Sequence, residues 1–500
     1  MAENSFDIII IGSGLGGLVT ANLLSKQGYH VCILEKNPHP GGCLQSFEKD
    51  GVVFDTGIHY VGALDEDQVL YKIFRYLDIM NDLNIRKMDI EGFDRFIIGD
   101  REYSYAMGYE NFRKRMIGYF PDEEQGINKY LCIIQEIAQS ISLYNLNPFQ
   151  FSPQLFYDKF RFGSAWEFIQ SVTTNEELRQ LLSGLNSLYA GKKETSFMFI
   201  HALINNHYIE SAWRFVDGSK QIADALCKRL RENGGRILLN KKAVSFQAEK
   251  GIIKSVKTSD TEIFKAKYFI STIHPYNTME MLDEGLVRKA YKKRLQNIKN
   301  TSSTFSLYIA LENGKIPYMN YNTSYYPNGD VWCLNYYNPK KFPQAFGVYP
   351  VADSQDELYT RALSVLAFMD YNEVARWENT HVEERGFEYE DFKQQKSMAI
   401  LNRLEDVFPG IGSAIKSFSS ATPLTLRDYT GTYRGATYGI ERDFTNQNES
   451  LIFPRTKVPN LLLTGQNLTM HGMFGVSMGA LLTFAELSDL NTLIENINNA

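Results

Sequence analysis

The sequence reads Phe6-Asp-Ile-Ile-Ile-Ile-Gly12-Ser-Gly14-Leu-Gly-Gly17 near its start, and Val31-Cys-Ile-Leu-Glu35 follows after a stretch with helical periodicity. An apolar run that leads into Gly-x-Gly-x-x-Gly and then into a helix is typical of a dinucleotide-binding turn. The first glycine allows the tight bend, the second lets a pyrophosphate approach the backbone, and the third lets helix and strand pack closely. The helix N-terminus adds partial positive charge. The pattern therefore predicts strand, turn, helix and strand around a dinucleotide.

Glu35 ends the second predicted strand, about 20 residues after the glycine motif. A carboxylate at this place accepts hydrogen bonds from ribose hydroxyls and disfavours a 2′-phosphate. An ordinary glycine-rich turn is the alternative interpretation of the motif. The strand, the helix and the acid around it favour the cofactor.

A second glycine-rich loop follows at Gly41-Gly42-Cys43-Leu-Gln-Ser-Phe47, and Phe54-Asp-Thr-Gly-Ile-His59-Tyr-Val-Gly62 comes after it. A nicotinamide-binding unit would continue into further alternating strands and helices, so a second loop this early favours a flavin over NAD. These two stretches resemble the retinol saturase branch of the phytoene desaturase and carotenoid isomerase flavoproteins.

The resemblance returns near the other end of the chain. Leu461-Leu-Leu-Thr-Gly465-Gln-Asn467 and Gly472-Met-Phe-Gly475-Val476 are similar to the closing flavin motif of that family, and Tyr433-Arg-Gly-Ala-Thr-Tyr438-Gly439 is similar to its penultimate block. Asn467 stands where the family usually has an acid, and its amide still offers hydrogen bonds without a charge. A buried strand followed by a glycine-bearing helix is the structural alternative for 461–480.

The motifs and the resemblance together imply FAD as cofactor and a set of residues that contact it. The resemblance also implies that Val244 contacts the adenine through its backbone. The expected FAD contacts are Gly12, Ser13, Gly14, Leu15, Gly16, Gly17, Glu35, Lys36, Gly42, Cys43, His59, Val244, Gly465, Gln466, Asn467, Gly475 and Val476.

The order of the motifs predicts an α/β fold in which a discontinuous Rossmann-like FAD-binding domain is interleaved with an α+β substrate domain that contains a mixed sheet. The FAD-binding domain is expected at 1–65, 213–285 and 451–500. The substrate domain is expected at 66–212 and 286–450, where Ser303 to Ala310 and Tyr359 to Phe368 have patterns typical of strands.

Composition excludes several functions. The 500 residues are 44% hydrophobic and 22% charged, and the net charge of −6 argues against nucleic acid as a partner. Five scattered cysteines without Cys-x-x-Cys spacing indicate a reducing compartment and no metal or disulfide framework. Without a signal segment or an apolar run of about 18 residues, we expect a cytoplasmic protein.

Aromatic residues are frequent, with 30 Tyr and 32 Phe, which suits a hydrophobic polyene or lipid substrate. The segment 144–162 mixes aromatic residues with Lys159 and Arg161, so it is a candidate for peripheral membrane contact. A tunnel wall or a satellite core is the alternative. The sequence gives no oligomeric state.

The resemblance implies an oxidoreductase that acts on carbon–carbon double bonds and saturates a retinol-like substrate by hydride transfer from reduced flavin. His59 is the first candidate for the proton donor and Tyr438 the second, although a lone histidine is more often structural. Since no second dinucleotide fingerprint occurs, the electron partner stays open between NAD(P)H, a separate reductase, a quinone and oxygen.

The resemblance leaves other functions open. A carotenoid or phytoene desaturase, a carotenoid isomerase and an amine-oxidase-like flavoenzyme would share the cofactor motifs, and fold alone cannot separate them. A flavin-free lipid carrier of related fold would have a degraded glycine loop, whereas Gly12, Gly14 and Gly17 are intact here.

Overall fold

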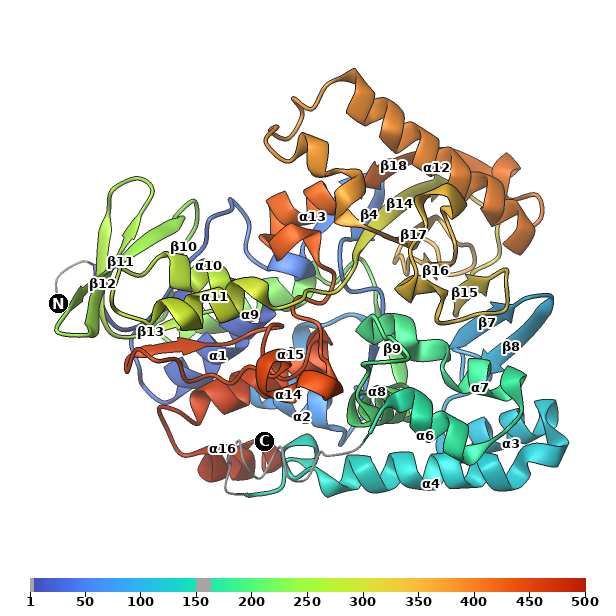
Figure 1. Cartoon of the computed structure of the whole chain (residues 1–500), viewed down its shortest axis with the longest axis horizontal. Helices are drawn as coiled ribbons and strands as arrows, with labels where there is room; N and C mark the ends of the chain where they lie inside the picture. Colours follow the sequence, from blue (N-terminus) through green and yellow to red (C-terminus); the bar gives the residue numbers. More distant parts are fainter. Residues whose placement is uncertain (1–3, 150–162) are drawn as a thin grey trace.

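The computed structural model describes residues 4–149 and 163–500 (Figure 1). One seven-stranded sheet combines strands from the N-terminal, middle and C-terminal parts of the chain. The strand order is β10 (Arg236–Leu238), β2 (Val31–Leu34), β1 (Ser5–Ile11), β13 (Ile263–Ser271), β12 (Ile252–Thr258) and β11 (Ala243–Glu249), with β19 (Leu461–Leu463) paired to the end of β13.

The centre of this sheet is parallel, from β10 through β2, β1 and β13 to β19. Its strands read as continuous apolar runs because both faces are covered; Ile8, Ile9 and Ile10 of β1 are completely buried. On one face α1 (Leu15–Lys26) packs against α9 (Lys220–Glu232) and α15 (Gly472–Phe484). Segments far apart in the sequence therefore build one layer.

A second seven-stranded sheet lies beside the first (Figure 1). Its order is β18 (Ile415–Ala421), β14 (Ser303–Leu311), β17 (Ala362–Met369), β16 (Phe346–Pro350), β15 (Asn322–Tyr326), β7 (Asp94–Ile98) and β8 (Arg101–Tyr105). Only β15 and β7 pair in parallel among these neighbours, so the sheet is mixed. The predicted α/β fold with an interleaved mixed sheet is confirmed.

Helices surround the second sheet. In Figure 1, α12 (Phe387–Val407) lies over β18 and β14, and a helical layer lies below β7 and β8. This layer contains α3 (Tyr109–Tyr119), α4 (Glu124–Ser140), α6 (Ala165–Val172), α7 (Glu176–Leu182) and α8 (Met198–Glu210).

Smaller elements join the two halves. A hairpin of β3 (Ser46–Lys49) and β4 (Val52–Asp55) packs on the second sheet, and a three-stranded sheet combines β5 (Val61–Gly62), β9 (Ala212–Phe215) and β6 (Ile85–Lys87). The other helices are α2 (Val69–Tyr76), α10 (Pro275–Glu280), α11 (Lys289–Asn297), α13 (Pro423–Thr430), α14 (Gln447–Ser450) and α16 (Leu490–Asn498).

Two of the sequence-based predictions concern a membrane-facing segment and the domain boundaries. The proposed membrane segment lies mostly in 150–162, outside the described residues, and its first residue, Tyr144, is buried. No helix in 4–149 and 163–500 has both the length and the apolar composition needed to cross a bilayer. The domain boundaries stay a prediction.

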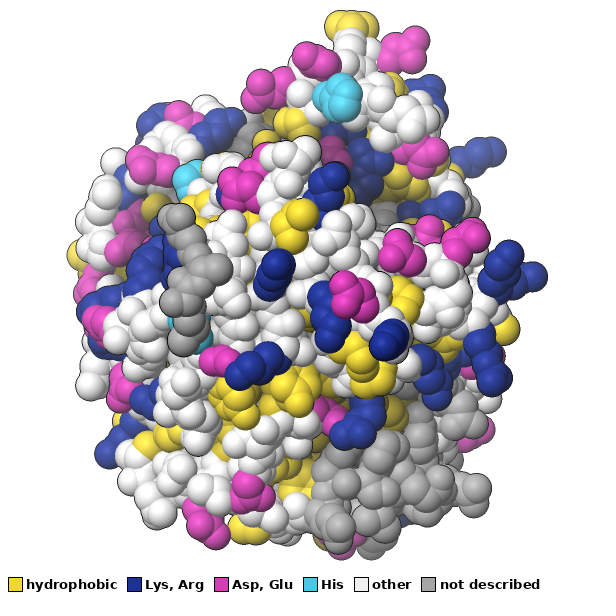
Figure 2. All heavy atoms as spheres, turned by 90° about the vertical axis from the view of Figure 1, so that its left-hand side faces the viewer, with side chains coloured by type: hydrophobic (Ala, Val, Ile, Leu, Met, Phe, Trp, Pro, Cys, Tyr) yellow, Lys and Arg dark blue, Asp and Glu magenta, His cyan; other side chains and the backbone are white. Residues whose placement is uncertain are grey.

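Figure 2 shows the face of the molecule on the side of the β11–β12 hairpin. Lys and Arg side chains alternate there with Asp and Glu, and hydrophobic side chains lie between them. A polyanion approaching this face would therefore meet charges of both signs.

Candidate FAD site and the adjoining aromatic cluster

A cavity of about 500 Å³ lies where β1, β2 and β13 end, and Ile11, Leu34 and Thr272 line it there. Ligands of open α/β sheets bind in the crevice beyond the carboxyl ends of the parallel strands. Residues from both ends of the chain meet in its wall. The predicted contacts that line it are Gly12, Gly14, Leu15, Gly16, Glu35, Lys36, Gly42, Cys43, Val244, Gly465, Gln466, Asn467 and Val476.

The glycines of the first turn have distinct surroundings. Gly12 has φ +94°, a conformation that favours glycine, and a Cβ on Gly17 would lie 2.3 Å from the Gly12 carbonyl oxygen. A Cβ on Gly14 would meet no atom within 4 Å and would point into free space. The turn thus leaves a bare backbone at the cavity, as a pyrophosphate requires.

The second glycine loop packs on the first. Gly42 has φ +57°, and its Cβ would lie 3.2 Å from Gly14 Cα, while the Gly41 amide donates to the Ser13 carbonyl oxygen at 3.1 Å. Cys43 lines the cavity beside them, and burial raises the pKa of its thiol to about 11, so the side chain is neutral at pH 7.

The C-terminal motif completes the wall. A Cβ on Gly16 would lie 2.7 Å from Gly465 Cα, so α1 and the loop after β19 touch backbone to backbone. Gly475 packs inside α15, where its Cβ would lie 2.6 Å from Met470 Cβ. Gly17 and Gly475 therefore set the packing of the two helices and do not line the cavity.

Glu35 is held by Ser13, which is itself completely buried. The Ser13 amide and hydroxyl donate to Glu35 Oε2 at 2.8 and 2.6 Å, and the Asn37 amide donates to Oε1 at 2.9 Å. Each carboxylate oxygen has lone pairs for more than one donor, so Glu35 can still accept from a ribose. Ser13 orients the carboxylate and does not line the cavity.

Two helix N-termini reach the cavity, those of α1 and α15. No side chain caps either of them. Gly472 and Met473 of α15 line the cavity, as Leu15 of α1 does. Uncapped N-termini offer free backbone N–H groups and partial positive charge to a phosphate or a flavin ring.

The loop after Gly465 is fixed by a buried arginine. Arg442 donates to the carbonyl oxygens of Gln466, Leu468 and Ile440, and Asn467 Oδ1 accepts from the Ile440 amide at 3.2 Å. Burial lowers the pKa of Arg442 to about 9, which leaves it charged at pH 7. Asn467 thus has a structural contact here that an acid could also have made.

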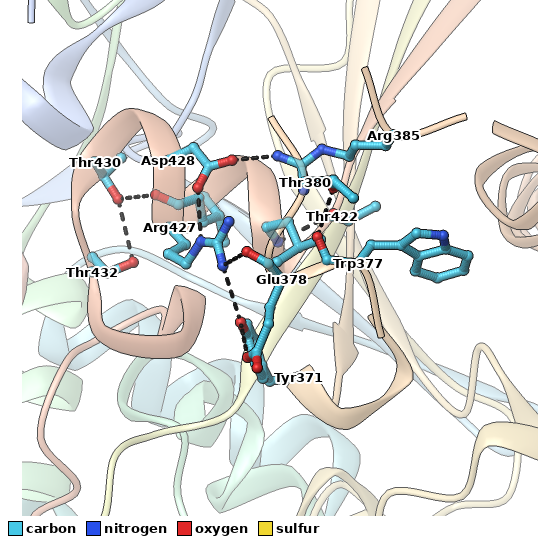
Figure 3. Close-up of polar contacts among 12 residues, drawn as sticks. Tyr371, Trp377, Glu378, Thr380, Arg385, Thr422, Arg427, Asp428, Thr430 and Thr432 are labelled. Atoms are coloured by element: carbon cyan, nitrogen blue, oxygen red, sulfur yellow. Dashed lines mark hydrogen bonds and ion pairs between the residues drawn. The ribbon is translucent and has the colours of Figure 1, made fainter. Parts of the chain in front are cut away.

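One side of the cavity is formed by residues 430–433, at the end of α13 and directly after it. Figure 3 shows Asp428 between Arg385 and Arg427, both of which bind its carboxylate; Arg427 also donates to Tyr371 and to the Glu378 carbonyl oxygen. Lys36 donates to the Asp428 carbonyl oxygen at 3.0 Å. This network holds α13 against the loop that follows Glu35.

Sequence reasoning missed several lining residues, chiefly Thr272, His274 and Tyr433. The His274 ring stacks on Tyr433 with centroids 5.2 Å apart, and burial lowers its pKa to about 4. A usable signal existed, because Thr272 and His274 follow a parallel strand at its carboxyl end, where such sites form.

The two predicted proton donors lie outside this cavity, in an adjoining aromatic cluster that we define as His59, Tyr60, Tyr208, Tyr349 and Tyr438. His59 stacks on Tyr349 at 4.8 Å, and Tyr60 contacts Tyr208 and Tyr349 at 4.6 and 6.1 Å. Tyr438 lines a smaller cavity of about 40 Å³ together with Tyr349.

Both candidates are neutral at pH 7. Burial, helped by the Arg214 charge, lowers the pKa of His59 to about 4, and burial raises the pKa of Tyr438 well above 10. His59 Nε2 is buried and has no hydrogen-bond partner among the described residues. A group of that kind is free to engage a ligand.

The cavity and the cluster are direct neighbours. Ile58 and Gly439 line the FAD-sized cavity, and the next residues along the chain, His59 and Tyr438, belong to the cluster. Among the residues that the structure describes, no three His, Cys, Asp or Glu side chains are placed to hold a metal ion.

Comparisons with known proteins agree with this geometry. A family model described as "Flavin containing amine oxidoreductase" matches residues 15–371. The all-trans-retinol 13,14-reductase of Danio rerio is 28% identical, over 98% of this chain and 87% of that protein. A 4,4'-diapophytoene desaturase (4,4'-diapolycopene-forming) of Methylomonas sp is 25% identical, over 88% and 87%.

Among solved structures, an oxidoreductase from Methanosarcina mazei superposes with a TM-score of 0.67 at 16% identity, covering 95% of this chain and 99% of that one. That likeness concerns the fold. The resemblance first carried by the motifs is confirmed by the curated relatives. The chain therefore belongs to the flavin-containing amine oxidoreductase family, as an oxidoreductase with FAD as its cofactor.

Proposed function

We propose that the protein saturates a carbon–carbon double bond of a polyene or isoprenoid lipid, with a retinol-like molecule as the substrate. The observation that carries this proposal is the aromatic cluster placed one residue away from the FAD cavity at Ile58–His59 and at Tyr438–Gly439. A conjugated hydrocarbon packs well against aromatic rings and needs few polar contacts.

The names of the relatives support the same substrate class. The Danio rerio relative is named for reduction of all-trans-retinol, and the Methylomonas relative for desaturation of a carotenoid precursor. Both names describe redox chemistry on conjugated carbon chains. Reduction is our choice because the reductase shares more of the chain with this protein, 98% against 88%.

In the proposed reaction one carbon of the double bond receives a hydride and the other receives a proton. Reduced FAD, when bound, would supply the hydride, which carries both electrons. His59 is our first candidate to deliver the proton, because its buried Nε2 has no partner in the described residues. Since its pKa is lowered to about 4, the ring is neutral at pH 7 and must gain a proton before it delivers one. Tyr438 is the second, with a hydroxyl that stays protonated at pH 7.

The contacts of individual residues with FAD belong to this proposal too. Gly12, Gly14 and Gly42 would lie along the pyrophosphate, Glu35 would accept from the ribose, and Val244 would face the adenine. Val244 lines the cavity and is exposed, which is consistent with a contact to the adenine.

Desaturation or isomerisation of a carotenoid is the second candidate function, supported by the Methylomonas relative. The same cavity and cluster would serve either direction. A flavin-free lipid carrier is disfavoured, because Gly14 and Gly42 keep the backbone open toward the cavity.

The deciding experiment is anaerobic. The purified protein is reduced chemically, all-trans-retinol or a carotenoid is added, and flavin absorbance and product masses are followed together. Reoxidation with a product heavier by two hydrogens supports saturation. If the flavin stays reduced while the oxidised protein removes hydrogen from a more saturated polyene, the protein is a desaturase.

The electron partner and the cellular setting are part of the proposal. Reduced nicotinamide that binds transiently, or a separate redox partner, would supply the electrons. We propose a cytoplasmic protein with peripheral membrane contact near 144–162. Anaerobic mixing with NADPH tests the first point, and co-sedimentation with phospholipid vesicles tests the second.

A further inference from the structure

A buried hydrogen-bond network is joined to the aromatic cluster through Tyr60. Tyr60 donates to Asp94 Oδ2 at 2.8 Å, and Asn322 Nδ2 donates to Asp94 Oδ1 at 2.7 Å. Arg214 Nη2 in turn donates to Asn322 Oδ1 at 2.8 Å. Asp94, Asn322 and Arg214 are 4%, 2% and 1% exposed, so an acid and a base are buried with one amide between them.

The network joins three elements. Asp94 begins β7 and Asn322 begins the parallel neighbour β15, where the two residues are in register. Arg214 lies on β9 and also donates to the Met319 carbonyl oxygen at 2.8 Å. A purely structural link between these strands would not require ionisable side chains, since burying a charged pair costs more free energy than burying an apolar pair of similar size.

We infer that Asp94 is a positioning residue for the proposed reaction: it fixes the Tyr60 ring in the aromatic cluster. This inference rests on the proposed function. Tyr60 carries the effect to the reaction site, because its ring contacts Tyr208 and Tyr349, and Tyr349 stacks on His59.

The surroundings of Asp94 place its titration near neutrality. Burial raises its pKa to about 7, although the hydrogen bonds from Asn322 and Tyr60 and the Arg214 charge oppose the rise. Arg214 is the charged group that faces it. The other titratable groups coupled to Asp94 are Tyr60, Tyr105 on β8, Tyr208 on α8, Tyr326 on β15 and Tyr349 on β16.

Above pH 7 the Asp94 carboxylate accepts hydrogen bonds from both Tyr60 and Asn322, and these bonds hold the cluster in one arrangement. Below it the protonated carboxyl can donate to the Tyr60 oxygen, and the Tyr60 proton must find another acceptor. We therefore expect the rate of polyene-dependent flavin reoxidation to rise with pH through about 7, on the order of tenfold, because misplacement of a reacting pair is costly.

Asp94→Asn is the sharpest test, because it mimics the protonated acid. The new amide can accept from Asn322 and donate to the Tyr60 oxygen, so the packing is retained. D94N should show at every pH the low rate that the wild type shows below pH 7. Tyr60→Phe removes the hydroxyl through which Asp94 acts on the cluster, so the pH step in the rate should be lost. The titration of Asp94 itself should move to higher pH, because one hydrogen bond that lowers its pKa is gone.

Asp353→Asn is the matched control. Asp353 is also a buried acid, and its described hydrogen-bond partners, Arg361 and the Gln355 amide, do not belong to the cluster. D353N should lower stability and keep the pH step. If D94N keeps the wild-type step as well, the inference is wrong.

Infrared spectroscopy provides a readout that needs no substrate. The wild-type spectrum minus the D94N spectrum should contain a C=O band of a protonated carboxyl that disappears as pH rises through about 7. Burial raises the pKa of Asp55 to about 6, and its band is present in both proteins and cancels. A difference band that titrates near pH 4 overturns the inference. If no polyene reoxidises the wild type but the band behaves as expected, the proposed function fails and the role in turnover fails with it, while the titrating carboxyl is confirmed.

Discussion

The FAD cavity and the aromatic cluster lie side by side but are built in opposite ways. The cavity is lined by short contiguous motifs, such as Gly12 to Gly17, whose backbone conformation shapes the wall. The cluster collects single side chains from distant segments, from Tyr60 to Tyr438. The cofactor motifs can therefore be recognised in short stretches of the sequence, whereas the members of the cluster are brought together only by tertiary packing.

The largest effect is expected from a change at the contact of Gly16 with Gly465. Gly16→Ala places a methyl group 2.7 Å from Gly465 Cα, and backbone cannot move aside as a side chain can. We expect loss of FAD and destabilisation by about 3 kcal/mol or more, measured by flavin absorbance per chain and by thermal unfolding.

Gly14→Ala is the matched comparison. Its methyl group meets no atom within 4 Å and its φ of −61° suits alanine, so the apoprotein should keep its stability while FAD binding fails. Gly118→Ala, on the exposed face of α3, should change neither property by more than about 1 kcal/mol. Equal loss of stability in G14A and G16A would contradict the comparison.

The second test uses pH dependence of stability. The pKa of Asp94 is about 7 in the folded protein against 3.8 as the ordinary value, so folding holds a proton that the unfolded chain releases. The free energy of unfolding therefore falls as pH rises from about 4 to 7, by an amount of order 4 kcal/mol. D94N should lack this component. Denaturant titrations of both proteins at several pH values measure the difference.

The third test separates the two regions by activity. His59→Ala removes a side chain of the cluster and leaves the FAD cavity intact, so flavin content should stay at the wild-type level. Turnover should fall about 100-fold if His59 holds the proton. Full turnover in H59A would exclude His59 and leave Tyr438→Phe as the variant to measure.

The fourth test returns to the cavity. Glu35→Gln keeps the shape of the side chain but replaces the carboxylate by an amide. The carboxylate accepts three hydrogen bonds from Ser13 and Asn37. We expect FAD affinity to fall by about 2 kcal/mol, roughly 30-fold, while kcat of the loaded enzyme is unchanged. Isothermal titration of the apoprotein measures the affinity. A change in kcat alone would mean that the two regions are not independent.

The smallest effect is expected for Lys36→Ala. Lys36 is exposed, and its one described hydrogen bond is to the Asp428 carbonyl oxygen. Its loss should loosen α13 at the cavity by about 0.5 kcal/mol, roughly a twofold faster release of FAD. Stopped-flow dissociation of FAD resolves a change of this size.

The same contrast explains what sequence could predict. Gly12, Gly14 and Glu35 belong to patterns set by backbone sterics and spacing, and the α/β fold follows from them. The roles of Ser13, Gly17 and Gly475 were less visible, because each acts by holding another element in place. Their direct contact with FAD stays a prediction.

Asp94, Arg214 and Asn322 gave no signal in the sequence at all. Arg214 and Asn322 lie 120 and 228 positions after Asp94, and polar residues scattered at such distances look like ordinary surface positions. Only the folded chain shows that they are buried and bonded together. The same holds for the stacking of His59 on Tyr349.

The contact between Gly16 and Gly465 has a consequence for how the protein is made. The first glycine turn leaves the ribosome early, but its wall is missing until β19 pairs with β13 and α15 packs on α1. Both events need residues beyond 460. A nascent chain can therefore form the first strands and helices long before it can retain its cofactor, so flavin loading must wait until β19 and α15 have been made and packed.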